Sequence, residues 1–233
     1  MYLDFIEFIL FEILYSSAYI GILYLFSKTL TYKFKLDDST QYFILHFVHN
    51  MIITTIVMPY CFQMLWDPLG IKTDYSSYKD YYYVLFPMVS GLHTFHLLKS
   101  YNKIQFDEII HHVITYTFTI INYILSHPFY YSYLIVLSGI PGGITYLLLF
   151  LQKLKLIEPL TEKKISYLLN VWVRSPITVA WSTLAFARLI YFEYSIINRL
   201  LILISMFFIP LNGIHFMTTI AESYHKHLFS KVE

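Results

Sequence analysis

The sequence predicts an all-α fold, a multi-pass transmembrane bundle of about seven helices. Of the 233 residues, 57% are hydrophobic and 13% are charged, whereas soluble domains usually carry about 25% charged residues. So few charges cannot cover a globular surface that faces water. The apolar residues also gather in stretches of roughly 20, the length of helix that crosses a bilayer core of about 30 Å. A third observation, the placement of the lysines, supports the same helix count.

The predicted helices cover most of the chain. They lie at about 5–27, 42–66, 80–98, 107–125, 129–151, 165–191 and 197–220. The first is not typical of a cleaved signal peptide, because it begins with Asp4 and Glu7 and no A-x-A site follows it. In the fifth, Pro141 and the two glycines after it are expected to kink or thin the helix. That stretch would serve either close helix packing or an opening for a lipid tail.

The basic residues indicate how the helices are oriented. Seven crossings place alternate connections on the same side of the membrane. One set, 28–41, 99–106, 152–164 and the C-terminal tail, holds eleven lysines: Lys28, Lys33, Lys35, Lys99, Lys103, Lys153, Lys155, Lys163, Lys164, Lys226 and Lys231. The other set holds only Lys72, Lys79 and Arg199. Because cytoplasmic loops carry excess Lys and Arg, the N-terminus is expected to be lumenal and the C-terminus cytosolic.

Polar side chains recur at helical spacing inside the apolar stretches. They are His46, His49 and Asn50; His93 and His96; Asp107, His111 and Thr115; Asn170, Arg174 and Thr178; and Asn212, His215 and Thr219. Polar groups at membrane depth are costly and usually face a protein interior. Any one of them is explained by an interhelical contact worth about 1 kcal/mol, but together they predict a shared polar cavity. Buried Arg174 needs a carboxylate partner, for which Asp107 and Glu12 are the candidates.

The segment FDEIIHHVITYTFT, residues 106–119, resembles the TLC family of membrane proteins, which includes the ceramide synthases. The pair His111 and His112, with Thr115 three residues further on, is similar to the family's HHxxT signature, and Asp107 precedes it. The resemblance implies a six-helix barrel over about 42–220, preceded by an N-terminal helix and loop at 1–41 and followed by a cytosolic tail at 221–233. It also implies the endoplasmic reticulum and a role in sphingolipid or other lipid metabolism.

By the same resemblance, His111 and His112 would be catalytic in transferring an acyl group from acyl-CoA to a lipid amine. A neutral imidazole can act as a general base or carry an acyl group, and Asp107, one turn earlier, can orient His111. Acyl-CoA would be a co-substrate, with no resident cofactor or metal. The residues expected to bind the membrane lipid are Thr115, His93, His96, Asn170, Arg174 and His215.

Residues 137–146, LSGIPGGITY, depart from the ceramide synthases. Ser138, Gly139 and Gly142 stand where those enzymes have a histidine and two aspartates, and no acidic residue lies between Glu108 and Glu158. This departure favours a second hypothesis, a lipid-binding, lipid-sensing or lipid-regulating protein without catalysis.

Two further hypotheses carry less support. The pairs His46/His49, His93/His96 and His111/His112 motivate a histidine-ligated membrane metalloenzyme, because imidazole suits Zn and Fe, but HxxHH boxes are absent. The other is a seven-helix receptor. A retinal protein is excluded because the seventh predicted helix has no lysine for a Schiff base, and a peptide or amine receptor usually has extracellular cysteines for a disulfide, which this chain lacks. The single cysteine, Cys61, excludes an intramolecular disulfide. A net charge of +1 gives no sign of a nucleic-acid partner.

Overall fold

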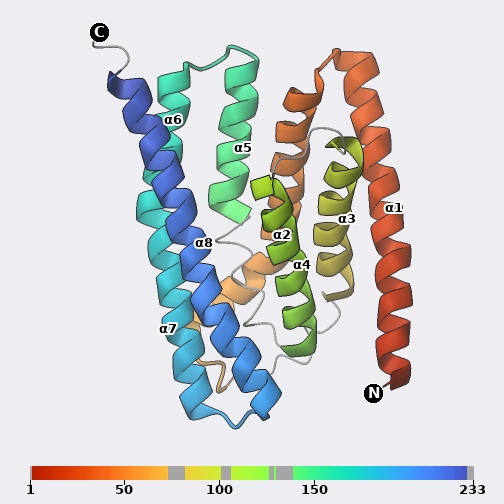
Figure 1. Cartoon of the computed structure of the whole chain (residues 1–233), viewed down its shortest axis with the longest axis vertical. Coiled ribbons are helices and arrows are strands. Elements are labelled where there is room, and N and C mark those ends of the chain that lie inside the picture. Colours follow the sequence, from red (N-terminus) through yellow and green to blue (C-terminus); the bar gives the residue numbers. More distant parts are fainter. Residues whose placement is uncertain (1, 73–81, 101–105, 126–128, 130–138, 230–233) are drawn as a thin grey trace. The chain divides into compact units, whose positions relative to one another are not determined.

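The structure, a computed structural model of the chain, describes residues 2–72, 82–100, 106–125, 129 and 139–229 (Figure 1). Its elements are α1 (Tyr2–Phe34), α2 (Asp38–Trp66), α3 (Tyr82–Ser100), α4 (Phe106–Leu125), α5 (Ile140–Lys153), α6 (Pro159–Leu169), the π-helical turn η4 (Asn170–Arg174), α7 (Ser175–Tyr191) and α8 (Ile196–Phe229). Because α6, η4 and α7 are continuous, the described part of the chain contains seven helical segments and no strand. The predicted all-α class is confirmed.

Several helix ends differ from the predicted ones. α1 continues to Phe34, and α8 continues to Phe229 through most of the predicted tail. α5 begins only at Ile140, with Pro141 in its first turn, where a missing N–H costs no hydrogen bond. Residues 130–138 of the predicted fifth helix lie outside the described residues, so the predicted kinking or thinning at Pro141 stays a prediction. Gly143 serves close packing, because a Cβ there would meet the Met51 side chain and lie 3.4 Å from Asn50 Cβ.

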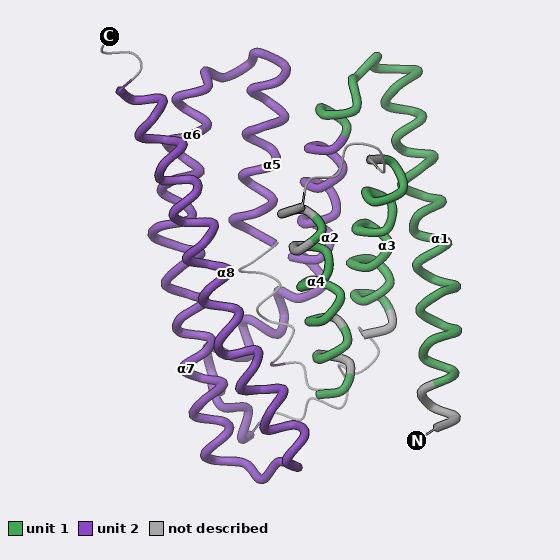
Figure 2. Tube along the Cα trace, in the orientation of Figure 1, with its two compact units in different colours: residues 1–41, 75–127 green, residues 42–74, 128–233 purple. Residues whose placement is uncertain are grey.

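The chain divides into two compact units (Figure 2). Unit 1 comprises residues 1–41 and 75–127, and unit 2 comprises residues 42–74 and 128–233. The division into 1–41, 42–220 and 221–233, and the six-helix barrel, stay predictions.

In unit 1, α3 packs against both α1 and α4. α1 and α3 approach closely at Gly91, where a Cβ would lie 3.1 Å from the Tyr19 ring and 3.2 Å from the Ser16 carbonyl oxygen. Lys99, at the end of α3, joins the turn between α1 and α2. Its Nζ lies 3.0 Å from Asp38 Oδ1, 2.9 Å from Gln41 Oε1 and 3.0 Å from Ser27 Oγ. Residue 99 and the connection 28–41 therefore lie at the same end of unit 1, in agreement with the lysine pattern.

In unit 2, α8 packs along α6 and α7, and α5 packs on α6. Tyr167 of α6 stacks on Tyr224 near the end of α8, with ring centroids 5.1 Å apart. At the other end of the continuous α6–α7 helix, Arg188 donates a hydrogen bond to the Leu69 carbonyl and lies 4.6 Å from the Phe192 ring centroid. Within this unit the lysine-rich and lysine-poor connections are therefore at opposite ends.

Three described helices are long and apolar enough to cross a membrane: α1 over Ile6–Phe34, α2, and α8. Along α1, large apolar side chains such as Leu10, Leu14 and Leu25 are more than 60% exposed, which suits a surface solvated by lipid tails rather than by water. The chain is an integral membrane protein.

Gly213 should tolerate no larger side chain, because α7 and α8 touch there. A Cβ at Gly213 would lie 2.6 Å from Thr178 Oγ1, and the Thr178 hydroxyl is held by a 2.7 Å hydrogen bond to the Ser175 carbonyl. We expect Gly213→Ala to lower the free energy of unfolding by about 1–3 kcal/mol, the usual range for overpacking, measured by thermal unfolding in detergent.

The matched control is Gly21→Ala in α1. No atom lies within 4 Å of a Cβ built at Gly21, so alanine there should be neutral or stabilising, by up to about 1 kcal/mol. Equal unfolding temperatures for the two variants would contradict the close contact at Gly213.

Candidate functional site

The structure pairs two predicted site residues across neighbouring helices of unit 1. Nδ1 of His93 in α3 lies 2.8 Å from Nδ1 of His112 in α4, and the rings are nearly perpendicular, at 80°. A neutral imidazole has one donor and one acceptor nitrogen. One ring must therefore carry its proton on Nδ1 and the other must accept it, so a single proton lies between them. Such a pair can release or accept a proton without first reorganising.

Tyr116, one turn after His112 on α4, extends this arrangement. Its hydroxyl donates to the Ser90 carbonyl oxygen at 3.2 Å and lies 2.5 Å from Thr94 Oγ1. Sequence reasoning missed both Tyr116 and Thr94. The signal was available for Tyr116, which is four residues after His112 and therefore on the same face of α4. Thr94 directly follows His93, and because adjacent residues on a helix do not share a face, spacing gave no signal for it.

Glu12 of α1 joins the same group through Ser90. The Ser90 hydroxyl donates to Glu12 Oε1, and Ser16 Oγ lies 3.2 Å from Glu12 Oε1 and 2.8 Å from Ser90 Oγ. Glu12 therefore faces α3. Its other oxygen, Oε2, is buried and has no hydrogen-bond partner among the described residues. We call this set of residues the unit 1 polar network: Glu12, Ser16, Ser90, His93, Thr94, His112 and Tyr116.

Of the other predicted residues of unit 1, the structure describes the side chains of His96 and Thr115. His96 is buried, three residues after His93 on α3, and Thr115 of α4 is half-buried. The side chains of His111 and Asp107 lie outside the described part of the structure. The predicted catalytic roles of these two residues stay predictions.

In unit 2, Asn170, Arg174 and Thr178 belong to a longer buried polar stripe. Its six members follow one another at intervals of four residues, and all are buried: Glu162, Ser166, Asn170, Arg174, Thr178 and Ser182. Hydrogen bonds link the first four: Ser166 Oγ to Glu162 Oε1 at 3.0 Å, Asn170 Nδ2 to the Ser166 carbonyl at 2.8 Å, and Arg174 Nη1 to Asn170 Oδ1 at 3.3 Å. The predicted helix began at 165, so Glu162 was missed.

The π-helical turn η4 keeps this stripe together. A step of four residues overshoots one turn of an ideal α-helix by about 40°, so five steps would rotate the stripe by about 200°. A single π turn takes up one extra residue and removes about 100° of that rotation. Pro176, just after η4, favours the wider turn, because its ring has no N–H and would crowd the Trp172 carbonyl in a regular α-helix.

Arg174 is buried on η4, and its guanidinium carbon lies 4.2 Å from the Phe216 ring centroid. Among the described residues, its Nε has no hydrogen-bond acceptor and no carboxylate forms an ion pair with it. Glu12, one predicted partner, bonds instead to Ser16 and Ser90. The pairing with Asp107 stays a prediction.

Two other predicted residues of unit 2, His46 and His215, lie in different surroundings. His46 Nδ1 lies 3.0 Å from the Tyr42 carbonyl, and the His46 ring stacks on Tyr146 of α5, with centroids 4.4 Å apart. His215 is exposed on α8. The predicted lipid-binding residues are thus divided between the two units, and a shared polar cavity stays a prediction. Within the described ranges, no three His, Cys, Asp or Glu side chains are placed to hold a metal ion.

No protein-family model matches the chain. No curated protein and no solved structure matches it either.

Proposed function

We propose that the chain is a TLC-type membrane protein that binds and acts on a long-chain lipid, with His112 and His93 at the centre of its site. The observation that carries this proposal is the 2.8 Å contact between the two imidazoles. Ionisable side chains inside a membrane protein are costly and usually functional. Here several ionisable side chains belong to the unit 1 polar network. The helices that carry them lie in the membrane, where lipids are the most accessible ligands.

The chemistry proposed for this site is acyl transfer from acyl-CoA to a lipid amine. The amine nitrogen attacks the thioester carbon, the amide C–N bond forms, and the C–S bond breaks. His112 takes the amine proton as a general base, and a proton passes to the leaving thiolate, giving amide and free thiol. In this proposal His93 orients His112, while His111 and Asp107 have the roles implied by the HHxxT resemblance. The proposed location is the endoplasmic reticulum.

A second candidate function is lipid binding without turnover. The stretch 137–146 has no acidic residue, and Gly143 in it packs against Met51 and Asn50. A stretch used for helix packing would contribute no catalytic groups. A third candidate, a histidine-ligated metalloenzyme, would be identified by metal analysis of the purified protein.

The test combines lipid analysis of the purified protein with lipidomics of cells that express it. We expect a co-purifying long-chain lipid and a changed lipid class, both lost in a His111→Ala, His112→Ala double variant and both reduced in His93→Ala. His225→Ala, at the exposed end of α8, is the matched control. Retained lipid without turnover of acyl-CoA would leave only the binding function. A protein that neither retains lipid nor alters any lipid class would overturn both.

The same proposal includes seven crossings, with a lumenal N-terminus and a cytosolic C-terminus. The contacts of Lys99 with Asp38 in unit 1 and of Tyr167 with Tyr224 in unit 2 support it, because each brings lysine-rich segments to one end of its unit. Reporter tags at the two termini are expected to lie on opposite sides of the membrane. Tags on the same side would mean an even number of crossings.

A further inference from the structure

Two helices, α1 and α5, end in the same unusual way. Lys35 follows α1 with φ 53°, and Lys155 follows α5 with φ 59°; they are the non-glycine residues with positive φ in the described part of the chain. In both, the next residue is a leucine whose amide reaches back along the helix. Leu36 N bonds to the Leu30 carbonyl at 3.4 Å, and Leu156 N bonds to the Leu151 carbonyl at 2.9 Å.

The sequences of these two turns match as well. Residues 33–38 read KFKLDD and residues 153–158 read KLKLIE, each a lysine, an apolar residue, a second lysine, a leucine, any residue and an acidic residue. In both cases the next helix begins at once, at Asp38 or at Pro159. We call residues 33–36 and 153–156 the lysine elbows.

Lysine is a poor choice for this backbone conformation. The left-handed position after a helix is usually glycine, because a Cβ there is strained. Both elbows place a lysine there, and both place a second lysine two residues earlier. Two positions of one chain thus hold a strained lysine where glycine would fit the backbone without strain. This indicates that the lysine side chains have a function of their own.

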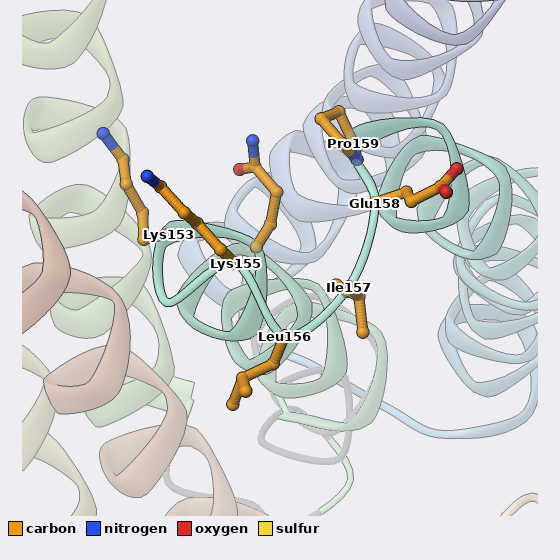
Figure 3. A pocket seen from close by; sticks show the side chains of 7 residues that line it. Lys153, Lys155, Leu156, Ile157, Glu158 and Pro159 are labelled. Carbon is orange, nitrogen blue, oxygen red and sulfur yellow. The ribbon is translucent and has the colours of Figure 1, made fainter.

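The geometry of the second elbow suits a phosphate. The turn lines a hollow of about 510 Å³, formed by Gln152, Lys153, Lys155, Leu156, Ile157, Glu158 and Pro159. Figure 3 shows the Lys153 and Lys155 amines side by side and directed the same way, with Leu156 directed away from them. Within the described residues, neither lysine forms an ion pair with a carboxylate. Two unneutralised ammonium groups next to apolar side chains match a phosphate attached to a lipid.

The placement of the elbows indicates which phosphate. The first elbow follows directly after the apolar span Ile6–Phe34, so Lys35 stands where that span leaves the hydrocarbon and meets the headgroups. Lys33, Lys35, Lys153 and Lys155 are all exposed. We propose that each lysine elbow binds the phosphate of an anionic phospholipid in the leaflet that the lysine-rich connections face. This inference is independent of the proposed chemistry at His112.

The test uses the purified full chain in neutral detergent and measures how far added dioleoyl phosphatidate raises the unfolding temperature. Bound lipid stabilises the folded state by mass action. Lys155→Gly is expected to raise the unfolding temperature without lipid by about 2–4 °C, since it relieves strain, and to weaken the second elbow's phosphatidate affinity about fivefold. Lys153→Gln with Lys155→Gly should weaken it about thirtyfold. Lys35→Gly and Lys33→Gln test the first elbow in the same way.

Lys164→Gln is the matched control, because it removes one exposed charge from α6 without touching an elbow. Lys155→Arg keeps the charge and should keep most of the response. Phosphatidylcholine should give little stabilisation. The proposal is overturned if phosphatidate raises the unfolding temperature of the elbow variants as much as that of the parent. It is also overturned if Lys164→Gln weakens the phosphatidate affinity as much as the elbow variants do. Equal stabilisation by inorganic phosphate would also overturn it, since the site would then serve a soluble anion.

Discussion

Replacing His112 by alanine should slow the proposed acyl transfer to a lipid amine by about 10²–10⁴-fold, the usual contribution of a general acid–base residue. His112 makes the 2.8 Å contact with His93, so the variant removes both the proposed base and the proton-sharing contact with His93. The measurement is the initial rate of amide formation from acyl-CoA by purified protein, at saturating concentrations of both substrates.

Two further variants separate positioning from catalysis. His93→Ala leaves His112 in place but unoriented, so it should lower the rate less than His112→Ala does. Tyr116→Phe removes only the hydroxyl that contacts Thr94 and Ser90 and should have the smallest effect. An unchanged rate in His112→Ala, with His225→Ala as the folding control, would remove His112 from the mechanism.

The second large effect is expected from deleting one residue of the α6–α7 helix. Deleting Trp172 together with Pro176→Ala should convert η4 into an ordinary α turn, because a π turn contains one extra residue. The buried faces of α6 and α7 would keep their orientations, and the deleted Trp172 side chain is 71% exposed. We expect the variant to fold, with Arg174 displaced relative to Phe216.

The matched variant deletes Val179, also with Pro176→Ala. Val179 is exposed on the regular helix α7, so its loss rotates all later residues by about 100°. Ser182, Ala185 and Arg188, all buried, would leave their positions, and Arg188 would lose the Leu69 carbonyl. We expect this variant to unfold at least about 6 °C below the Trp172 deletion, in thermal unfolding in detergent. Equal damage from the two deletions would mean that η4 is not an inserted residue.

Hydropathy and lysine placement predicted the helical segments because both reflect the membrane directly. A helix end is harder to predict where the chain leaves the hydrocarbon but stays helical, as α8 does up to Phe229. The start at Pro159 was missed for a related reason: α6 begins with polar residues such as Glu162 and Lys163, which a search for apolar stretches excludes.

For the candidate site, the sequence predicted which residues share a face of each helix, but not which helices bring those faces together. Spacing of three or four residues shows which side chains share a face, so His93 and His112 could each be selected. The packing of α3 on α4 determines which face of one helix contacts which face of the other. The sequence of either helix alone does not show this packing. Ser90 was missed because serine is common in this chain and carries no signal until a partner is placed beside it, whereas Tyr116 was missed although its spacing from His112 places both on one face of α4. Arg174 was correctly predicted to be buried, but its contact with Phe216 depends on the packing of α8.

The uneven hydropathy of the helices has a consequence for how the protein reaches its membrane. Of the described helices, α1, α2 and α8 are apolar and long enough to insert by themselves, since insertion follows the summed transfer free energy of a segment. α3 carries Ser90, His93 and His96, and the α6–α7 helix carries Glu162 and Arg174. Each such group is costly in hydrocarbon until a partner covers it. α1 and the turn that follows it up to Gln41, which are made before α3 and are joined to it by Lys99, would then provide the surface on which α3 is accepted. Biogenesis should therefore be most sensitive to substitutions at Ser16, Ser27 and Gln41, which receive the polar groups of the incoming helix, and less sensitive to the apolar residues of α1 that face lipid.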